Sequence, residues 1–285
     1  MKKLVLLTLC SALLCGCSSS LYDIEITGGK QELMSYKKMS ISKQDYFEVL
    51  LAKYGAQTIV ENALIDIAKK EITDTDKVKD LVESKKKTYA EYYEGNIDDV
   101  AKANGYSDTQ LYIQNIIEPQ AYLELLNKTY IEANYDQLIK EHSATRFKVI
   151  LCTKESDALN IIEKTKDNLN KFDELMKDNE NAEDVDIVTK NSALDKNIID
   201  ALPTLSAYTK DQIHSKAIKL ANGAYAVLYV YDTKRDDKEE WINALKNDSV
   251  IIETAEGHYL KKYNFNVYDE TLKDTIKNLS SQYLE

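Results

Sequence analysis

Histidine and cysteine are the side chains that most often support metal-dependent or nucleophilic chemistry, and this chain has three and four of them. His142, His214 and His258 fall in three separate segments, without the spacing of metal ligands. Cys152 lies in an apolar run, which is typical of a buried, inert thiol. The sequence has neither a glycine-rich phosphate loop nor a nucleophile elbow. We therefore expect no bound metal and no cofactor.

Cys17 differs from the other cysteines because the residues before it suit a covalent modification. Lys2 and Lys3 precede an apolar run of about a dozen residues, Leu4 to Leu14, which is too short to cross a bilayer but fits a signal peptide. Leu14-Cys15-Gly16-Cys17 follows and resembles the lipobox of bacterial lipoproteins. We predict that residues 1–16 are removed and that Cys17 carries lipid. The alternative is an ordinary secretory peptide that is cut elsewhere.

A lipid on Cys17 would hold the protein at the outer face of the cytoplasmic membrane, in a Gram-positive-type cell envelope. Residues 17–30 begin with three serines after the cysteine and are predicted to form the anchor and its flexible tether. Removal of residues 1–16 takes the formal net charge from −11 to −13, because Lys2 and Lys3 are lost. The remaining sequence has no basic stripe that could neutralise phosphates, so we expect no nucleic-acid partner.

The helical period dominates the first half of the exported chain. Only 8 glycines and 2 prolines occur in 285 residues, which favours long helices. One apolar stripe, Phe47 to Tyr54, ends at Gly55, and a second runs from Ile59 to Ile67. This spacing predicts two helices joined as a hairpin.

A second helical region is predicted after Asn104-Gly105, which should stop the preceding segment. Ser107 and Gln110 have the spacing of a capping box at the start of a long helix that runs through Leu126. Pro119 should kink or interrupt this helix.

The periodicity changes near residue 145. Arg146–Cys152 and Val185–Val188 have the pattern of short strands, with two helices between them around residues 158–162 and 172–176. Asn222-Gly223 lies between two apolar runs, 217–220 and 225–231, which predicts a tight β-hairpin. Lys234–Glu240 is predicted to be a charged linker, and helical patterning then continues to the end.

In this order, these features resemble the PrsA-type foldase lipoproteins of Gram-positive bacteria, which are relatives of the SurA chaperones. Ile41–Phe47, followed by Lys53-Tyr54-Gly55, is similar to the opening helix of that family, and Leu260–Val267 is similar to the segment that closes its helical lobe. The resemblance covers nearly the whole chain. It implies a mostly helical α+β fold with two lobes, in which a parvulin-like α/β domain is inserted into a SurA-like chaperone lobe.

The resemblance also implies domain boundaries. Residues 31–143 would form the N-terminal helical chaperone segment, residues 144–233 the parvulin-like domain, and residues 234–285 a C-terminal helical segment that packs on the N-terminal lobe. Unfolded or partly folded exported polypeptides would be the partners, and a homodimer is left open.

The family's activity is peptidyl-prolyl cis-trans isomerisation, and the residues at the corresponding positions differ here. The histidine of the first parvulin strand corresponds to Lys148, and that of the last strand corresponds to Tyr225. The Gly-Asp-Leu-Gly turn of the family corresponds to Val185–Val188, which keeps Asp186. Isomerases lower the barrier to rotation with positioned hydrogen bonds and an apolar pocket, without a covalent step. Both an active isomerase and a retained binding module therefore stay open.

Tyrosine is the commonest aromatic residue by far, with 20 Tyr against 4 Phe and 1 Trp. Its rigid, amphipathic ring suits a surface that contacts unfolded chains. The candidates for client binding are Tyr89, Tyr92, Tyr93, Tyr122 and Tyr130, with Tyr135 as a further one. A coding bias that enriches Tyr, Lys, Asn and Ile everywhere explains the count equally well.

The sequence leaves three functions open. The favoured one is a membrane-anchored foldase or chaperone that binds unfolded exported proteins and assists their folding after secretion. The second is an active parvulin-type isomerase, and the third is a passive binding lipoprotein that uses the same fold.

Overall fold

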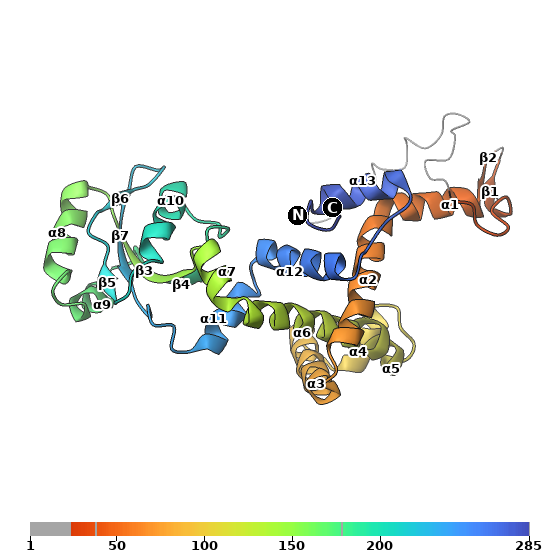
Figure 1. Cartoon of the computed structure of the whole chain (residues 1–285), viewed down its shortest axis with the longest axis horizontal. Coiled ribbons are helices and arrows are strands. Elements are labelled where there is room, and N and C mark those ends of the chain that lie inside the picture. Colours follow the sequence, from red (N-terminus) through yellow and green to blue (C-terminus); the bar gives the residue numbers. More distant parts are fainter. Residues whose placement is uncertain (1–23, 38, 178, 285) are drawn as a thin grey trace. The chain divides into compact units, whose positions relative to one another are not determined.

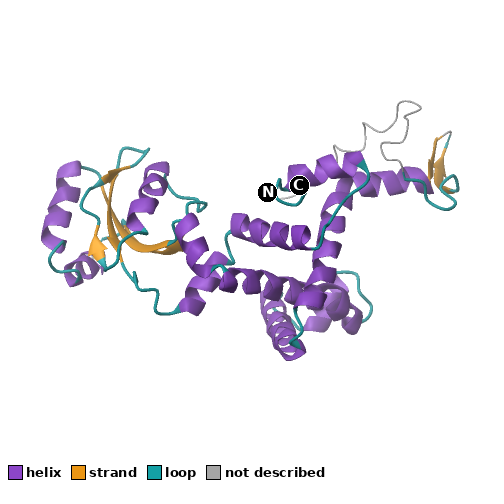
Figure 2. Cartoon of the chain, in the orientation of Figure 1, coloured by secondary structure: helices purple, strands orange, loops and turns teal. Residues whose placement is uncertain are grey.

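A computed structural model describes residues 24–37, 39–177 and 179–284. The predicted signal peptide and Cys17 lie outside the described residues. The chain forms two compact units, one made of residues 24–63 and 260–284 and the other of residues 64–259. Helices predominate and the strands are few, so the predicted mostly helical α+β class is confirmed (Figure 1, Figure 2).

The first unit combines the two ends of the described chain. It begins with a short antiparallel ribbon, β1 (Glu32–Tyr36) and β2 (Met39–Ser42), followed by α1 (Lys43–Leu50). The Ser42 hydroxyl accepts the backbone N–H of Asp45, whose carboxylate accepts the backbone N–H of Ser42, so a reciprocal capping box starts α1. Near the other end, Asp269 caps α13 (Glu270–Leu279).

Gly55 does not end a helix, and the predicted helical hairpin at this point is wrong. The chain stays helical through a π-helical turn, Leu51–Gly55, into α2 (Ala56–Glu71). A Cβ atom on Gly55 would lie 2.6 Å from Leu51 Cδ1 and 3.3 Å from Leu272 Cδ2 of α13. Glycine therefore leaves room here for the side chain of Leu51 in the preceding turn and for Leu272 of α13, and it does not act as a stop signal.

The second unit continues with helices that have side-chain caps. Asp74, Asn96 and Asp108 accept backbone N–H groups at the starts of α3, α4 and α5. Gly105, with φ +82°, follows α4 as expected. The bounds are α3 (Thr75–Tyr92), α4 (Ile97–Ala103), α5 (Thr109–Tyr112), α6 (Glu118–Ala133) and α7 (Tyr135–Glu141).

The predicted start of the long helix needs correction. Asp108, rather than a Ser107–Gln110 box, supplies the cap, because its carboxylate accepts the Gln110 N–H at 2.7 Å. The predicted irregularity at Pro119 takes the form of a π-helical turn, Ile113–Ile117, directly before α6. Pro119 itself lies in the first turn of α6, directly after this π-helical turn.

An α/β module follows α7. Its sheet is antiparallel with strand order β4-β3-β7-β5, and β6 also pairs with β7. The predicted strands and the Asn222-Gly223 hairpin are present, and Gly223 has φ +88°. Helix α10 and strand β5 were not predicted. The bounds are β3 (Thr145–Cys152), α8 (Glu155–Thr165), α9 (Asn170–Lys177), β4 (Ala182–Val188), α10 (Lys196–Leu205), β5 (Gln212–Ile213), β6 (Ile218–Lys219) and β7 (Tyr225–Val230).

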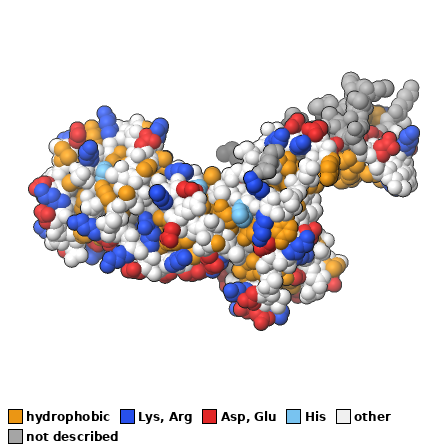
Figure 3. Space-filling model, in the orientation of Figure 1, with side chains coloured by type: hydrophobic (Ala, Val, Ile, Leu, Met, Phe, Trp, Pro, Cys, Tyr) orange, Lys and Arg blue, Asp and Glu red, His pale blue; other side chains and the backbone are white. Residues whose placement is uncertain are grey.

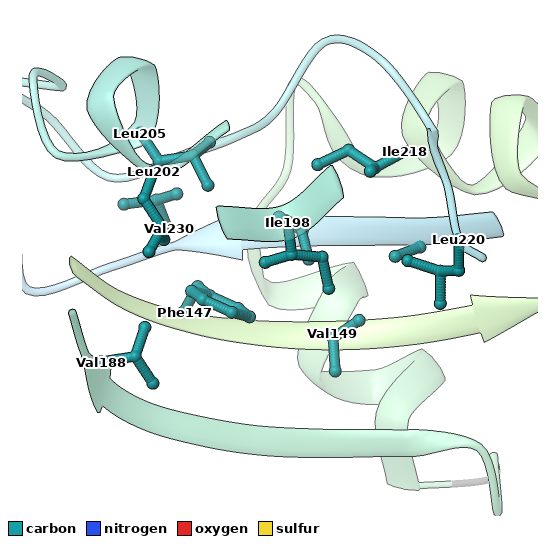
Figure 4. Close-up of a cluster of buried hydrophobic side chains, with 11 residues drawn as sticks. Phe147, Val149, Val188, Ile198, Leu202, Leu205, Ile218, Leu220 and Val230 are labelled. Atoms are coloured by element: carbon teal, nitrogen blue, oxygen red, sulfur yellow. The ribbon is translucent and has the colours of Figure 1, made fainter. Parts of the chain in front are cut away.

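Helices cover both faces of this sheet. On one face, Ile198, Leu202 and Leu205 of α10 pack over Phe147 and Val149 of β3, together with alternate residues of β7 (Figure 4). On the other face, the side chains of α8 and α9 pack against a second cluster that contains Ile150, Phe172, Val227 and Tyr229. The period-2 alternation of β3 and β7 therefore supplies two apolar layers from the same strands.

Two further helices, α11 (Lys238–Leu245) and α12 (Ser249–Lys262), follow the module. The predicted charged linker is shorter than expected, because Asp237 caps α11 and Lys238–Glu240 form its first turn. Trp241 and Leu245 are buried against α6, α7 and Ala144. Within the described part of the chain, no helix combines the length and the apolar character that a membrane span requires.

Candidate functional site

Lys148, at the first parvulin-like position, is engaged inside the module. Its ammonium nitrogen lies 2.7 Å from Asp173 Oδ1 of α9. It also lies 5.8 Å and 5.0 Å from the ring centres of Tyr229 and Tyr231. Its side chain is mostly buried in this setting of one carboxylate and two aromatic rings. The charge therefore has its partners within the protein.

Tyr225, at the second parvulin-like position, does not meet Lys148. In the β3–β7 ladder Lys148 is opposite Tyr229, whereas Tyr225 is opposite Cys152 at the other end. Both side chains belong to the face covered by α8 and α9, but four positions of strand separate them, roughly 13 Å. Tyr225 packs at the edge of the apolar cluster on that face. The two positions are thus separate in space.

Asp186 lies at an irregularity of the sheet. The register between β3 and β4 shifts after Phe147, which is opposite Asp186, while Lys148 is opposite Asp184. Asp186 has φ +65°, a left-handed conformation that aspartate tolerates better than most residues. Its Oδ1 lies 2.9 Å from Arg146 Nε. The bulge turns this carboxylate toward the junction with α11 and away from Lys148.

A polar pair that sequence reasoning passed over lies beside α10. The hydroxyl of Tyr208 and Nδ1 of His214 are 2.8 Å apart. Burial lowers the pKa of His214, and Lys216 lowers it further. Tyr208 also packs against the apolar layer under α10. Tyr208 precedes the short strand β5 and His214 follows it, and nothing in their sequence spacing indicates this contact.

Three of the predicted client-binding aromatics gather at one end of α3. We define the tyrosine cluster as Tyr89, Tyr92, Tyr93, Tyr106 and Tyr112. Within it, Tyr92 and Tyr93 make an edge-to-face contact at 5.1 Å, and so do Tyr106 and Tyr112 at 5.3 Å.

The cluster has a fixed base and an exposed rim. Burial raises the pKa of Tyr112, and the phenols of Tyr89, Tyr93 and Tyr106 raise it further. The Tyr89 hydroxyl donates to Gln120 Oε1 of α6. By contrast, 79% of Tyr92 and 53% of Tyr93 are exposed. Two aromatic rings are therefore presented to solvent on a packed support.

The other predicted aromatics lie elsewhere on the helices. Tyr130 contacts the rings of His258 and Tyr259 on α12 at 5.1 and 6.4 Å. Tyr122 is half-buried on α6, and Tyr135 is buried under the ammonium group of Lys238. The structure thus brings Tyr89, Tyr92 and Tyr93 together and places Tyr130 against α12.

Arg146 connects the module to α11. Its two terminal nitrogens each lie 2.7 Å from an oxygen of Glu240, a bidentate pair. Hydrogen bonds to Glu240 raise the pKa of Arg146 above its usual value, against the opposing effect of desolvation. Asp232 is the third carboxylate near Arg146, after Asp186 and Glu240, and its Oδ2 lies 3.4 Å from a terminal nitrogen of Arg146. The same oxygen accepts the indole N–H of Trp241.

A second polar network lies at the same junction, next to a cavity of about 380 Å³. Asp248 accepts hydrogen bonds from the Thr189 hydroxyl and from the amide nitrogen of Asn191. The Asn191 amide also lies 3.0 Å from Nδ1 of His142. Burial lowers the pKa of His142, and Lys190 adds to this effect while Asp248 and Glu141 oppose it. The cavity lining includes Asp186, Glu240 and Asp248, so polar groups dominate it.

Metal chemistry has no evident ligand set in the part of the chain that the structure describes. No three His, Cys, Asp or Glu side chains come together there as a metal site would require. The tyrosine cluster, by contrast, presents an exposed aromatic surface.

The chain is similar to solved structures of PrsA foldases and of a SurA-like chaperone. Peptidylprolyl isomerase (PrsA) from Bacillus cereus is 19% identical, over 88% of this chain and 99% of that one, with a TM-score of 0.45. Foldase protein PrsA from Streptococcus pneumoniae is 20% identical, over 89% and 100%, with a TM-score of 0.38. A SurA-like chaperone from Campylobacter jejuni is 18% identical, over 83% and 98%, with a TM-score of 0.26.

The names of these structures are those of the foldases and chaperones that the sequence resembles. No protein-family model matches the chain, and no curated protein matches it in sequence.

Proposed function

We propose that this protein is a chaperone anchored by lipid on Cys17 at the outer face of the cytoplasmic membrane, where it binds unfolded exported polypeptides and assists their folding. The observation that carries the proposal is the tyrosine cluster, in which Tyr92 and Tyr93 are exposed above packed aromatic neighbours. The sequence resemblance to PrsA-type foldases supports the same class of function.

The contacts within the α/β module favour binding of unfolded chains over prolyl isomerisation. A catalytic donor must be free to address the twisted amide of a substrate. The Lys148 ammonium group instead pairs with Asp173, and Tyr225 packs on the apolar layer. Because the ladder separates these two residues, they do not form a joint site. The module therefore acts as a structural or binding element.

The tyrosine cluster is suited to weak contact with many different chains. Aromatic rings offer large area with few rotatable bonds, so their immobilisation on binding costs little. The edge-to-face contact between Tyr92 and Tyr93 already restricts both rings. Each ring adds on the order of 1 kcal/mol to the binding of an apolar segment. Such a surface binds unfolded chains without requiring one sequence.

A second candidate function, prolyl isomerisation, is favoured by one observation. The Tyr208 hydroxyl and the half-buried His214 ring share a hydrogen bond beside α10. A neutral pair of this kind could hydrogen-bond a prolyl substrate. This candidate requires activity that depends on His214, whereas the chaperone does not.

Suppression of the aggregation of a chemically denatured client tests the proposed function. The unmodified protein should reduce light scattering at near-stoichiometric amounts. The double variant Tyr92→Ser, Tyr93→Ser should need roughly thirtyfold more protein, since two rings are lost. The matched control Tyr54→Ser, Tyr268→Ser removes two exposed tyrosines of the other unit and should behave like the unmodified protein.

Two results would count against the proposal. If the unmodified protein leaves client scattering unchanged, the chaperone function fails and the passive binding lipoprotein takes its place. Equal protection by the cluster variant and the unmodified protein would exclude the tyrosine cluster as the client site.

A further inference from the structure

The β1–β2 ribbon has one apolar face and one serine face. The ladder pairs Tyr36 with Met39 and Met34 with Ile41, and it pairs Ser35 with Ser40 between them. Side chains of paired residues lie on the same side of a ribbon, and successive residues alternate. Met34, Tyr36, Met39 and Ile41 therefore share one face, and the two serines share the other.

This apolar face is uncovered in the structure. The exposed fractions are 57% for Met34, 66% for Tyr36, 46% for Met39 and 40% for Ile41. In the described part of the chain, β1 and β2 pair only with each other. A two-stranded ribbon without a covered face is marginal in water. Exposed apolar side chains continue onto α1, which follows β2 directly (Figure 3). Exposed apolar side chains on two adjoining elements indicate an interaction site.

The charges around the ribbon differ in sign from the chain as a whole. From Glu32, the first residue of β1, to Lys43 the sequence has three lysines and one acidic residue, although the whole chain carries a formal charge of −11. Lys37, next to β1, lies over the ring of Tyr36 at 5.3 Å. A basic margin around an apolar face fits an anionic lipid surface.

The position of the ribbon in the chain also favours the membrane. The predicted lipid attachment at Cys17 precedes the first described residue, Ile24, by seven residues. Seven residues span at most about 25 Å when fully extended. If Cys17 is lipidated, as the proposed function holds, Ile24 stays within this distance of the anchor. Its carbonyl accepts a hydrogen bond from Gln44 in the first turn of α1, directly after the ribbon.

We propose that the apolar face of the β1–β2 ribbon inserts into the headgroup region of an anionic bilayer and forms a second membrane contact beside the lipid anchor. Met34, Tyr36, Met39 and Ile41 contact the acyl boundary, and Lys37 and Lys43 contact lipid phosphates. The tyrosine ring and the lysine stems suit this layer, because each has an apolar body and a polar end.

Vesicle sedimentation of the exported form, residues 17–285 with Cys17→Ser, tests the ribbon without any acyl chain. This protein should sediment with vesicles of equal parts phosphatidylglycerol and phosphatidylcholine, and less with phosphatidylcholine alone or at high salt. The variant Met34→Ser, Tyr36→Ser, Met39→Ser should bind at least tenfold more weakly. The control Leu111→Ser, Leu159→Ser, Tyr268→Ser removes exposed apolar side chains elsewhere and should bind like the parent.

The proposal is overturned if the parent protein does not sediment with anionic vesicles, or if the ribbon variant binds as well as the parent. A ribbon variant that only lowers the oligomeric state in sedimentation velocity would assign the face to a second copy of the chain. Circular dichroism checks that each variant is folded. Fatty-acid labelling at Cys17 and client protection are measured separately, so failure of the ribbon leaves the proposed function standing.

Discussion

The carboxylate of Asp248 accepts a hydrogen bond from the hydroxyl of Thr189, 59 residues earlier in the chain. The same carboxylate accepts the backbone N–H groups of Val250 and Ile251, at 3.0 and 3.3 Å, and so caps α12. One buried side chain therefore joins the end of β4 to the helix that follows α11. This contact links the α/β module to its flanking helices within the compact unit of residues 64–259.

Substitution of Asp248 tests that statement. Asp248→Ala removes a helix cap and leaves Thr189 and Asn191 without their acceptor, so it should lower the free energy of unfolding by about 2–3 kcal/mol. Asp237→Ala removes the more exposed cap of α11 and should cost about 1 kcal/mol. Urea denaturation followed by circular dichroism measures both. Equal losses would mean that Asp248 acts only as a local cap.

The stability of the protein should fall as the pH is lowered through the range in which histidine titrates. Burial lowers the pKa of His142 in the folded state, and the Asn191 amide faces its Nδ1. As the pH falls below about 6.5, the unfolded chain takes up a proton before the folded chain does. The stability present above this pH is therefore lost on acidification.

His142→Gln is the variant that checks this pH dependence. The free energy of unfolding of the unmodified protein should decrease between pH 7 and pH 5, and that of His142→Gln should decrease less steeply. His214→Gln should also flatten the slope, because burial lowers the pKa of His214 as well. An unchanged slope in both variants would show that these rings do not govern acid stability.

Lipid attachment is the part of the proposal that falls outside the described residues. Cells grown with a labelled fatty acid should incorporate the label into the unmodified protein, and Cys17→Ala should abolish it and leave an uncleaved or released protein. Cys152→Ala is the control, because this buried thiol should not be acylated. Undiminished label in Cys17→Ala would contradict the predicted lipobox.

Local patterns in the sequence were sufficient for elements whose signals are local. The alternation along β3 and the Asn222-Gly223 turn predicted the central strands, and Gly105 predicted the end of α4. Helix α10 was missed, although Ile198, Leu202 and Leu205 have helical spacing. Gly55 misled because the chain stays helical through it, where it leaves room for Leu51 and for the distant Leu272.

The site was harder to predict because it depends on register. The comparison with parvulin strands placed Lys148 and Tyr225 at the two histidine positions of one site. In the structure, however, Lys148 is paired with Tyr229. Neither that register nor the bulge before Asp186 has a signal in the sequence. The Tyr89, Tyr92 and Tyr93 group was found from composition and spacing, whereas the support from Tyr106 and Tyr112 needed the fold of α4 and α5.

We propose that function resides in client binding and not in catalysis at the parvulin-like positions. The most direct measurement compares the unmodified protein with Lys148→Ala and Tyr225→Phe, both in a protease-coupled prolyl isomerase assay and in client aggregation. We predict isomerisation at background for all three proteins and full client protection by both variants. Isomerisation well above background that collapses in either variant, where loss of one positioned donor typically costs about a hundredfold, would contradict the account and identify an enzyme.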